Sequence, residues 1–145
     1  DANVLARRVK CDIVYMDPPY NSRQYCSMYH VLEILAKWDK PPLYGATAKP
    51  LHLDKKSDFG KKKAIKVFND LVNNVDARYI AVSYSNTYDA KSKTSNNKMT
   101  LEEIRQILEL RGTTKMFCMD YKPFNTATSE LVNHQEILFL TKVMI

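Results

Sequence analysis

Four consecutive residues combine an acidic group, two rigid residues and an aromatic ring: Asp17, Pro18, Pro19 and Tyr20. The exocyclic amine of a base is a poor nucleophile, because its lone pair is conjugated into the ring. A carboxylate that accepts a hydrogen bond from this amine increases its nucleophilicity and stabilises the positive charge that develops as a methyl group is transferred. The Pro18 carbonyl can accept the second amine hydrogen, and the Tyr20 ring can stack on a base taken out of a duplex. The two prolines would hold these groups with little entropy to lose.

The position of this motif in the chain also favours a reactive site. Residues 11–16 (CDIVYM) form a short apolar run rich in β-branched and aromatic side chains, which predicts a buried strand. The prolines after Asp17 cannot continue a central strand, so Asp17 is expected at the carboxyl end of that strand. Ligands of open α/β sheets bind at this end.

The segment DIVYMDPPYNSRQY resembles motif IV of the adenine-N6 DNA methyltransferases. Carried over residue by residue, Asp17, Pro18 and Tyr20 match the catalytic positions, and Pro19 is their structural partner. The resemblance implies a partial Rossmann-like fold that depends on S-adenosylmethionine, with a mostly parallel sheet, an antiparallel edge strand and helices on its faces. It also implies methyl transfer to a flipped adenine in double-stranded DNA, in a restriction-modification setting. The segments YIAVSYSN and NHQEILFLTK are similar to later strands of that family, although they are less specific.

Two other hypotheses stay open. Enzymes that methylate RNA or a protein amide use a similar motif, often with Asn in place of the acidic residue, so Asp17 argues against this reading without excluding RNA. The second alternative is a catalytically incomplete remnant or a nucleic-acid-binding fragment, which the missing cofactor motif favours for the isolated chain.

The cofactor motif of a complete methyltransferase would be a Gly-containing turn after an upstream strand. The chain has three glycines, Gly45, Gly60 and Gly112, and none precedes the motif. We therefore expect residues 1–145 to form a single domain that covers motif IV onward, with the missing N-terminal half of the methyltransferase as a possible partner. Asp1 stands where an acidic residue of related enzymes contacts the cofactor adenosine, and an exposed chain end is the alternative. Asp17 is also expected to border the cofactor.

Apolar spacing predicts the remaining elements of the fold. A capping box, in which Thr100 is the N-cap and Glu103 the third helical residue, marks the start of one helix, and Gly112 is expected at its C′ position. Strands separated by helices imply a parallel α/β sheet, while the last two strands, with no helix between them, predict an antiparallel pair at one edge. The predicted elements are strands at 11–16, 79–84, 115–121 and 136–143, helices at 25–38, 64–75 and from 100 onward, and polar connections at 43–63 and 85–99.

Several polar and aromatic residues are candidates for contacts with the base or the DNA. Those near the motif or the second strand can reach the same crevice, whereas the lysines can pair with phosphates, which salt would weaken. For the lysines, the alternative is a solvated loop. For Tyr25 it is the core face of a helix, and for Ser85 and Asn86 it is an ordinary turn at the end of a strand. The candidates are Asn21, Arg23, Tyr25, Lys61, Lys62, Lys63, Ser85 and Asn86, with Ser83 at the same strand end and Lys49, Lys55, Lys56, Lys91, Lys93 and Lys98 as further lysines.

The composition is that of a folded, basic domain. The net charge of +6 and pI of about 9.2 suit a polyanionic partner such as nucleic acid, and simple solubility explains them equally well. No apolar run approaches the roughly 20 residues that a membrane span needs. The three cysteines, Cys11, Cys26 and Cys118, form no CxxC pair, which argues against a zinc site and favours a reducing, cytoplasmic location.

Overall fold

The computed structural model describes residues 1–22, 24–51, 56–86, 97–120 and 135–144. Its elements, in chain order, are α1 (Ala2–Ala6), β1 (Lys10–Met16), α2 (Tyr25–Met28), α3 (His30–Lys37), β2 (Leu43–Tyr44), β3 (Lys49–Pro50), the 3₁₀ helix η1 (Asp58–Gly60), α4 (Ala64–Asn74), β4 (Asp76–Ser85), α5 (Leu101–Glu109), β5 (Gly112–Asp120) and β6 (Gln135–Val143).

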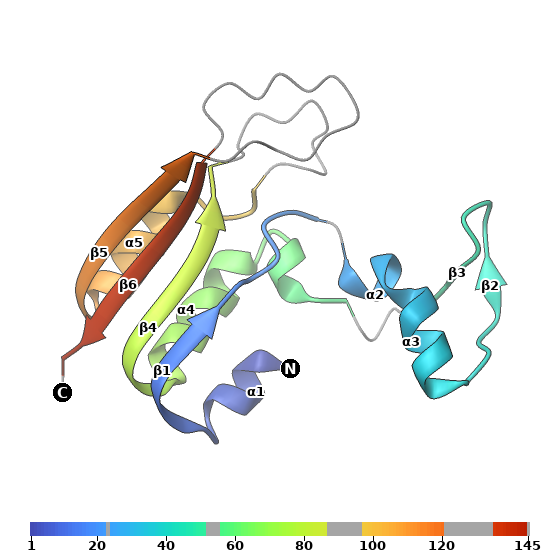
Figure 1. Ribbon diagram of the computed structural model, residues 1–145, viewed down its shortest axis with the longest axis horizontal. Helices are drawn as coiled ribbons and strands as arrows, with labels where there is room; N and C mark the ends of the chain where they lie inside the picture. Colours follow the sequence, from blue (N-terminus) through green and yellow to red (C-terminus); the bar gives the residue numbers. More distant parts are fainter. Residues whose placement is uncertain (23, 52–55, 87–96, 121–134, 145) are drawn as a thin grey trace.

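In the described residues, the main sheet has four strands in the order β1-β4-β6-β5. Strands β1 and β4 run parallel, while β6 is antiparallel to both of its neighbours (Figure 1). The four predicted strands are therefore present, and the prediction of an α/β class is confirmed. The last two strands form the predicted antiparallel pair at one edge of the sheet. Of the two, β5 is the edge strand, and β6, which runs opposite to its neighbours, lies next to it.

This arrangement also means that only one of the three neighbouring strand pairs in the described sheet is parallel. The reason lies in the two hydrogen-bonding edges that every strand carries. Strand β6 uses one edge for β5, as a strand with no intervening helix would, and its other edge for β4. The chain order of the elements indicates the pairing of β6 with β5, but it does not indicate the pairing of β6 with β4.

The core lies between one face of this sheet and the helices α4 and α5, which Figure 1 shows behind it. Alternate residues of β4 and β6 point into the core, as expected for strands with one packed face. The apolar sides predicted for both helices are buried there, and Thr100 and Glu103 form the predicted capping box. The central buried side chains are Phe68, Leu71, Val72, Ile80, Val82, Tyr84, Ile104, Leu108 and Phe139.

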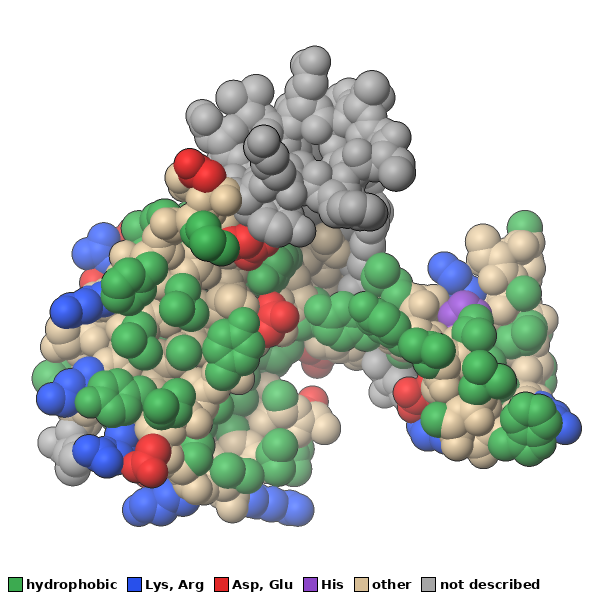
Figure 2. Space-filling model, in the orientation of Figure 1, with side chains coloured by type: hydrophobic (Ala, Val, Ile, Leu, Met, Phe, Trp, Pro, Cys, Tyr) green, Lys and Arg blue, Asp and Glu red, His purple; other side chains and the backbone are tan. Residues whose placement is uncertain are grey.

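The other face of the sheet carries apolar side chains that no described element covers. Strand pairing places Ile13 and Tyr15 of β1 on the same face as Leu138 of β6 and Phe117 of β5. Ile13 and Tyr15 are each 63% exposed, so the strand predicted at residues 11–16 is present but is not buried on this face. Figure 2 shows hydrophobic side chains spread over this face of the sheet. Within the described residues, helices therefore cover one face of the sheet, not both.

The predicted helix at residues 25–38 differs most from the structure. It is divided at Tyr29 into α2 and α3, which lie beside the β2–β3 hairpin and away from the sheet (Figure 1). Leu32, Leu35 and Trp38, whose apolar spacing predicts this helix, are exposed, Trp38 by 65%. Apolar periodicity predicts a helix with an apolar side, but it does not say which partner covers that side. The connection at 43–63, predicted without regular structure, contains β2, β3 and η1.

Gly112 is the first residue of β5, not the residue that ends α5. A Cβ atom at this position would lie 2.0 Å from the carbonyl oxygen of Lys142 on β6. We expect Gly112→Ala to lower the free energy of unfolding by about 1–3 kcal/mol, because the two strands must separate locally. Urea unfolding measures this change. Thr113→Ala, an exposed change one residue away, is the control, and equal losses in the two variants would contradict the prediction.

Candidate active site

The motif follows β1 directly, at the carboxyl ends of the parallel strands β1 and β4, as predicted. Met16 is the register partner of Val82, so Asp17 lies beside Ser83 of the neighbouring strand. The described chain places two cavities around the motif, and both are lined in part by Asp17, Pro19 and Tyr25.

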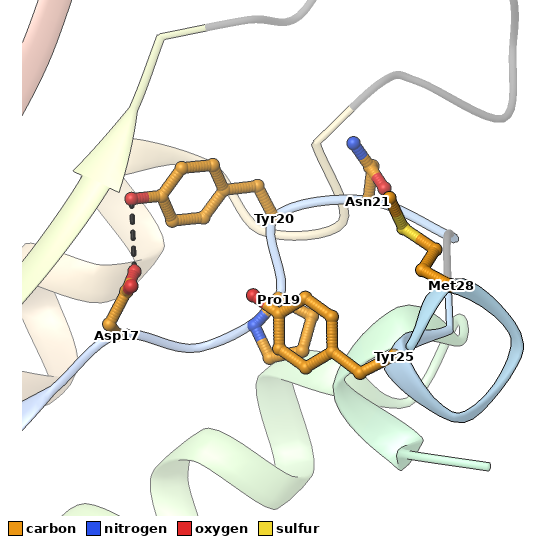
Figure 3. A pocket seen from close by; sticks show the side chains of 6 residues that line it. All are labelled: Asp17, Pro19, Tyr20, Asn21, Tyr25 and Met28. Atoms are coloured by element: carbon orange, nitrogen blue, oxygen red, sulfur yellow. Dashed lines mark hydrogen bonds between the residues drawn. The ribbon is translucent and has the colours of Figure 1, made fainter. Parts of the chain in front are cut away.

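Asp17 is held through one of its two carboxylate oxygens. Its Oδ1 accepts a hydrogen bond from the Ser83 hydroxyl at 3.0 Å and another from the Tyr20 phenol at 3.1 Å, the second drawn in Figure 3. In the described part of the chain, no hydrogen bond reaches Oδ2 of Asp17 or the carbonyl of Pro18. These two acceptors are therefore available for a donor from outside the chain.

Tyr20 is fixed at both its backbone and its ring. Its carbonyl accepts hydrogen bonds from the Lys98 amide at 2.8 Å and from the Tyr84 hydroxyl at 3.3 Å. Its ring meets the ring of Tyr84 edge-on, with a centroid distance of 4.8 Å, and its hydroxyl lies 3.5 Å from Oε2 of Glu136. The predicted stacking of Tyr20 on a base remains a prediction, and the structure adds that the phenol binds Asp17.

The environment of Tyr20 changes its acidity. Burial raises the pKa of its phenol above the ordinary value of 10.0, and the nearby hydroxyl of Ser83 acts in the opposite direction. The negative charges of Asp17 and Glu136 raise this pKa further. Tyr20 is therefore a neutral hydrogen-bond donor to Asp17 at physiological pH.

We expect the Tyr20 phenol to ionise only above pH 10.0, its ordinary pKa. The folded protein holds this proton more tightly than the unfolded chain, so the associated stability is fully present below pH 10.0 and is lost as the pH rises toward the folded-state pKa. The ultraviolet titration of tyrosinate, taken as the difference between wild type and Tyr20→Phe, isolates this group from the other tyrosines. A difference titration centred at or below the ordinary value would contradict the prediction.

The first cavity opens on the side of Asp17, Tyr20 and Tyr25 and has a volume of about 250 Å³ (Figure 3). It is smaller than the cavities that hold drug-sized ligands, and its mixture of rings and polar groups suits a small planar molecule. Burial and the charge of Asp17 raise the pKa of Tyr25, so its hydroxyl is also neutral there. Asn21 and Met28 complete the wall, which brings the predicted residues Asn21 and Tyr25 to the motif.

The second cavity is mainly apolar and has a volume of about 430 Å³. It lies along the edge of β1 that no described strand pairs with, between α1, η1 and α4, and Pro18 lines it. Asp1, predicted to contact a cofactor, caps α1 by accepting hydrogen bonds from the amides of Asn3 at 2.9 Å and Val4 at 3.2 Å. Ala2 lines this cavity, while Asp1 is not among its lining residues.

Ser85 and Asn86, which lie at the end of β4 and were predicted to contact the substrate, make hydrogen bonds within the fold. Ser85 is 2% exposed, and its carbonyl accepts a hydrogen bond from Asn97. The backbone and side chain of Asn86 bind the backbone of Gln135, which joins the end of β4 to the start of β6. Their proposed contact with substrate remains a prediction, beside a structural role that the model now describes.

The positive charge of the predicted DNA-binding lysines, Lys61, Lys62 and Lys63, is partly neutralised. Asp58 forms ion pairs with Lys61 and Lys63, each at 2.7 Å, and their hydrogen bonds lower the pKa of Asp58. Lys62 is exposed and has no ion pair within the described residues. Arg23, Lys55, Lys91 and Lys93 lie outside the described residues.

Sequence reasoning did not single out Tyr15 or Glu136. It placed Ser83, with Ser85 and Asn86, at the crevice of Asp17 as a possible substrate or cofactor contact, but it did not predict a hydrogen bond between Ser83 and Asp17. A usable signal existed for Ser83. Strands β1 and β4 are parallel and pair Met16 with Val82. The next residues, Asp17 and Ser83, therefore lie side by side. Glu136 approaches Tyr20 only because β6 inserts next to β4, and the sequence does not reveal that pairing.

Comparison with known proteins agrees with the geometry of the motif. The sequence model of a family described as D12 class N6 adenine-specific DNA methyltransferase matches residues 1–109. The chain is 37% identical to the type II methyltransferase M.FokI of Planomicrobium okeanokoites, over 98% of this chain and 22% of that protein. It is 32% identical to the type II methyltransferase M.NlaIII of Neisseria lactamica, over 93% of this chain and 37% of that protein. The modification methylase StsI of Streptococcus sanguinis is 46% identical over 59% of this chain and 13% of that protein.

The chain thus spans well under half the length of these relatives. No solved structure matches it significantly. Among the helices that the model describes, none has the length and apolar character needed to cross a bilayer.

Proposed function

The chain belongs to the D12 class of N6 adenine-specific DNA methyltransferases, and on this basis we propose that it is the amine-binding part of a restriction-modification enzyme. Its substrate in this proposal is an adenine flipped out of double-stranded DNA. The names of its relatives, which are type II methyltransferases and modification methylases, support the biological setting.

One observation carries the proposal. At the end of β1, the described chain leaves two adjacent acceptors without an internal donor, namely Oδ2 of Asp17 and the carbonyl of Pro18. An exocyclic amine has two hydrogens, and two acceptors from one rigid motif can take both of them. The nitrogen lone pair is then held away from the protein and toward an incoming methyl group.

The chemistry assigned to this chain follows from these contacts. S-adenosylmethionine, when bound, would supply a methyl group carried on a positively charged sulfur. The carbon–sulfur bond would break as the nitrogen–carbon bond forms, and the sulfur would leave as a neutral thioether. Asp17 stabilises the positive charge that the amine nitrogen gains as its bond to the methyl carbon forms. It also accepts the proton that this nitrogen then loses, which leaves the methylated exocyclic amine neutral. Tyr20 and Tyr25 are proposed to hold the ring of the base in the smaller cavity by stacking.

The apolar cavity along β1 fits part of the cofactor. Val14, Met16 and Pro18 offer apolar walls for a flat ring or an alkyl chain, with Asp17 at the border. None of the chain's glycines lines this cavity, so a close backbone turn for the polar end of the cofactor must come from elsewhere. We propose that the rest of the protein supplies it and completes a Rossmann-like sheet next to β1.

Binding to duplex DNA is proposed to use the net positive charge of +6. Lys62, which has no ion pair in the described chain, is the better candidate in the cluster for a phosphate contact. Lys61 and Lys63 would first have to leave Asp58.

The test is methyl transfer by the full-length protein. With labelled S-adenosylmethionine and duplex DNA, label is expected in N6-methyladenine after digestion to nucleosides. Label in N4-methylcytosine, or in RNA or a protein amide but not in DNA, would overturn the proposal. Activity of the full-length protein with none for residues 1–145 alone would support the proposed division of the site. A full-length protein that binds DNA but never transfers a methyl group would favour a catalytically incomplete remnant.

A further inference from the structure

We propose that Ser83 and Tyr15 are positioning residues for Asp17, and that they reserve its Oδ2 for the substrate amine. The two hydroxyls come from neighbouring strands and act in sequence, with Tyr15 holding Ser83 and Ser83 holding the carboxylate. This inference rests on the proposed function, since it concerns the same amine site.

The direction of the hydrogen bonds follows from the number of protons available. The phenol of Tyr15 donates to Oγ of Ser83 at 3.0 Å, and Oγ of Ser83 donates to Oδ1 of Asp17 at 3.0 Å. A serine hydroxyl has one proton, and an ionised carboxylate can only accept. Ser83 must therefore donate to Asp17, and the hydrogen bond from Tyr15 fixes the rotation of the Ser83 hydroxyl about its Cβ–Oγ bond.

The sheet positions both hydroxyls. Tyr15 pairs with Ala81 in the parallel register of β1 and β4, and Ser83 is two residues further along β4. Residues two apart in a strand share a face, so Ser83 lies on the same open face as Tyr15, at the end where β1 gives way to Asp17. The ring of Tyr15 is 63% exposed, but its hydroxyl is directed along the sheet to Ser83.

Both donors within the described chain bind the same carboxylate oxygen. Ser83 and Tyr20 saturate Oδ1 of Asp17, which leaves Oδ2 as the stronger free acceptor. They also oppose rotation of the carboxylate about its Cβ–Cγ bond. If Ser83 is removed, the carboxylate has only Tyr20 to orient it, and the amine meets a poorly aligned acceptor. The effect falls on the chemical step, because the contacts that bind the base remain.

The full-length enzyme provides the test. We expect Ser83→Ala to lower kcat about 10- to 100-fold, as the loss of a hydrogen bond to a charged group would, with the KM for DNA unchanged. Ser83→Thr keeps the hydroxyl and is expected to restore most of the rate. Tyr15→Phe is expected to lower kcat in the wild-type background and to have no effect in the Ser83→Ala background, because Tyr15 acts through Ser83.

Tyr79→Phe is the matched control. Tyr79 lies on the same open sheet face, beside Ile13, and within the described chain its hydroxyl makes no hydrogen bond. This change should leave kcat unaltered. Additive effects of Tyr15→Phe and Ser83→Ala, or a Ser83→Thr variant as slow as Ser83→Ala, would overturn the proposal.

A structural measurement separates this inference from the proposed function. Crystal structures of the full-length wild-type protein and its Ser83→Ala variant are expected to differ in the rotation of the Asp17 carboxylate. An unmoved carboxylate would overturn the positioning role, even in an active enzyme. Conversely, a wild type that methylates no adenine would refute the proposed function, while the carboxylate orientation would still decide whether Ser83 and Tyr15 hold Asp17.

Discussion

Replacing Asp17 with alanine is expected to reduce methyl transfer by the full-length protein by about 1000-fold or more. Removal of one preorganised group that stabilises charge in a transition state commonly costs 100- to 1000-fold, on the order of 3–4 kcal/mol. Asp17 has two such tasks in the proposed reaction, since it stabilises the charged amine and accepts its proton. The measurement is the single-turnover rate with saturating DNA and S-adenosylmethionine, which separates chemistry from product release.

Two further variants serve as controls for the Asp17→Ala measurement. Asp17→Asn keeps the size of the side chain and one carbonyl acceptor but removes the charge, so we expect a rate between those of wild type and Asp17→Ala. Asp12→Ala removes an exposed carboxylate from the same strand, where it pairs with Arg78 at 3.2 Å, and should leave the rate unchanged. Retained activity in Asp17→Ala would refute the assignment, whereas equal losses in Asp12→Ala would indicate damage to β1.

The second large effect concerns the sheet that holds the motif. Phe139 of β6 is 0% exposed and packs in the core between the sheet and its two helices. We expect Phe139→Ala to lower the free energy of unfolding by about 3–5 kcal/mol, which combines lost apolar burial with the cavity left behind. Domains of this kind are commonly stable by only about 5–15 kcal/mol, so this loss would leave much of the protein unfolded at moderate temperature. Urea unfolding followed by circular dichroism measures it.

Leu138 provides the matched control, one residue away on the same strand. It is 38% exposed on the open face, so Leu138→Ala is expected to cost the isolated chain well under half as much as Phe139→Ala. Similar losses in the two variants would mean that both faces of β6 are packed. A larger cost of Leu138→Ala in the full-length protein than in residues 1–145 would indicate that another part of that protein covers this face.

The features that could be predicted from the sequence are local. The strand before Asp17, the apolar sides of α4 and α5, and the capping box at Thr100 depend on residues within a few positions of one another, and all are present. The motif also depends only on adjacent residues, because the acceptors of Asp17 and Pro18 belong to one short segment. Local features of this kind can be recognised in a single sequence.

Which surfaces meet could not be predicted from the sequence, and it is seen in the tertiary structure. That structure placed β6 between β4 and β5, brought Ser83 and Glu136 to the motif, paired Lys61 and Lys63 with Asp58, and left the apolar side of α3 exposed. A strand has two edges and a helix one apolar side, and many partners can satisfy each of them. The choice depends on the packing of the whole domain, so residues far apart in the chain gain their roles around Asp17 only once the sheet has formed.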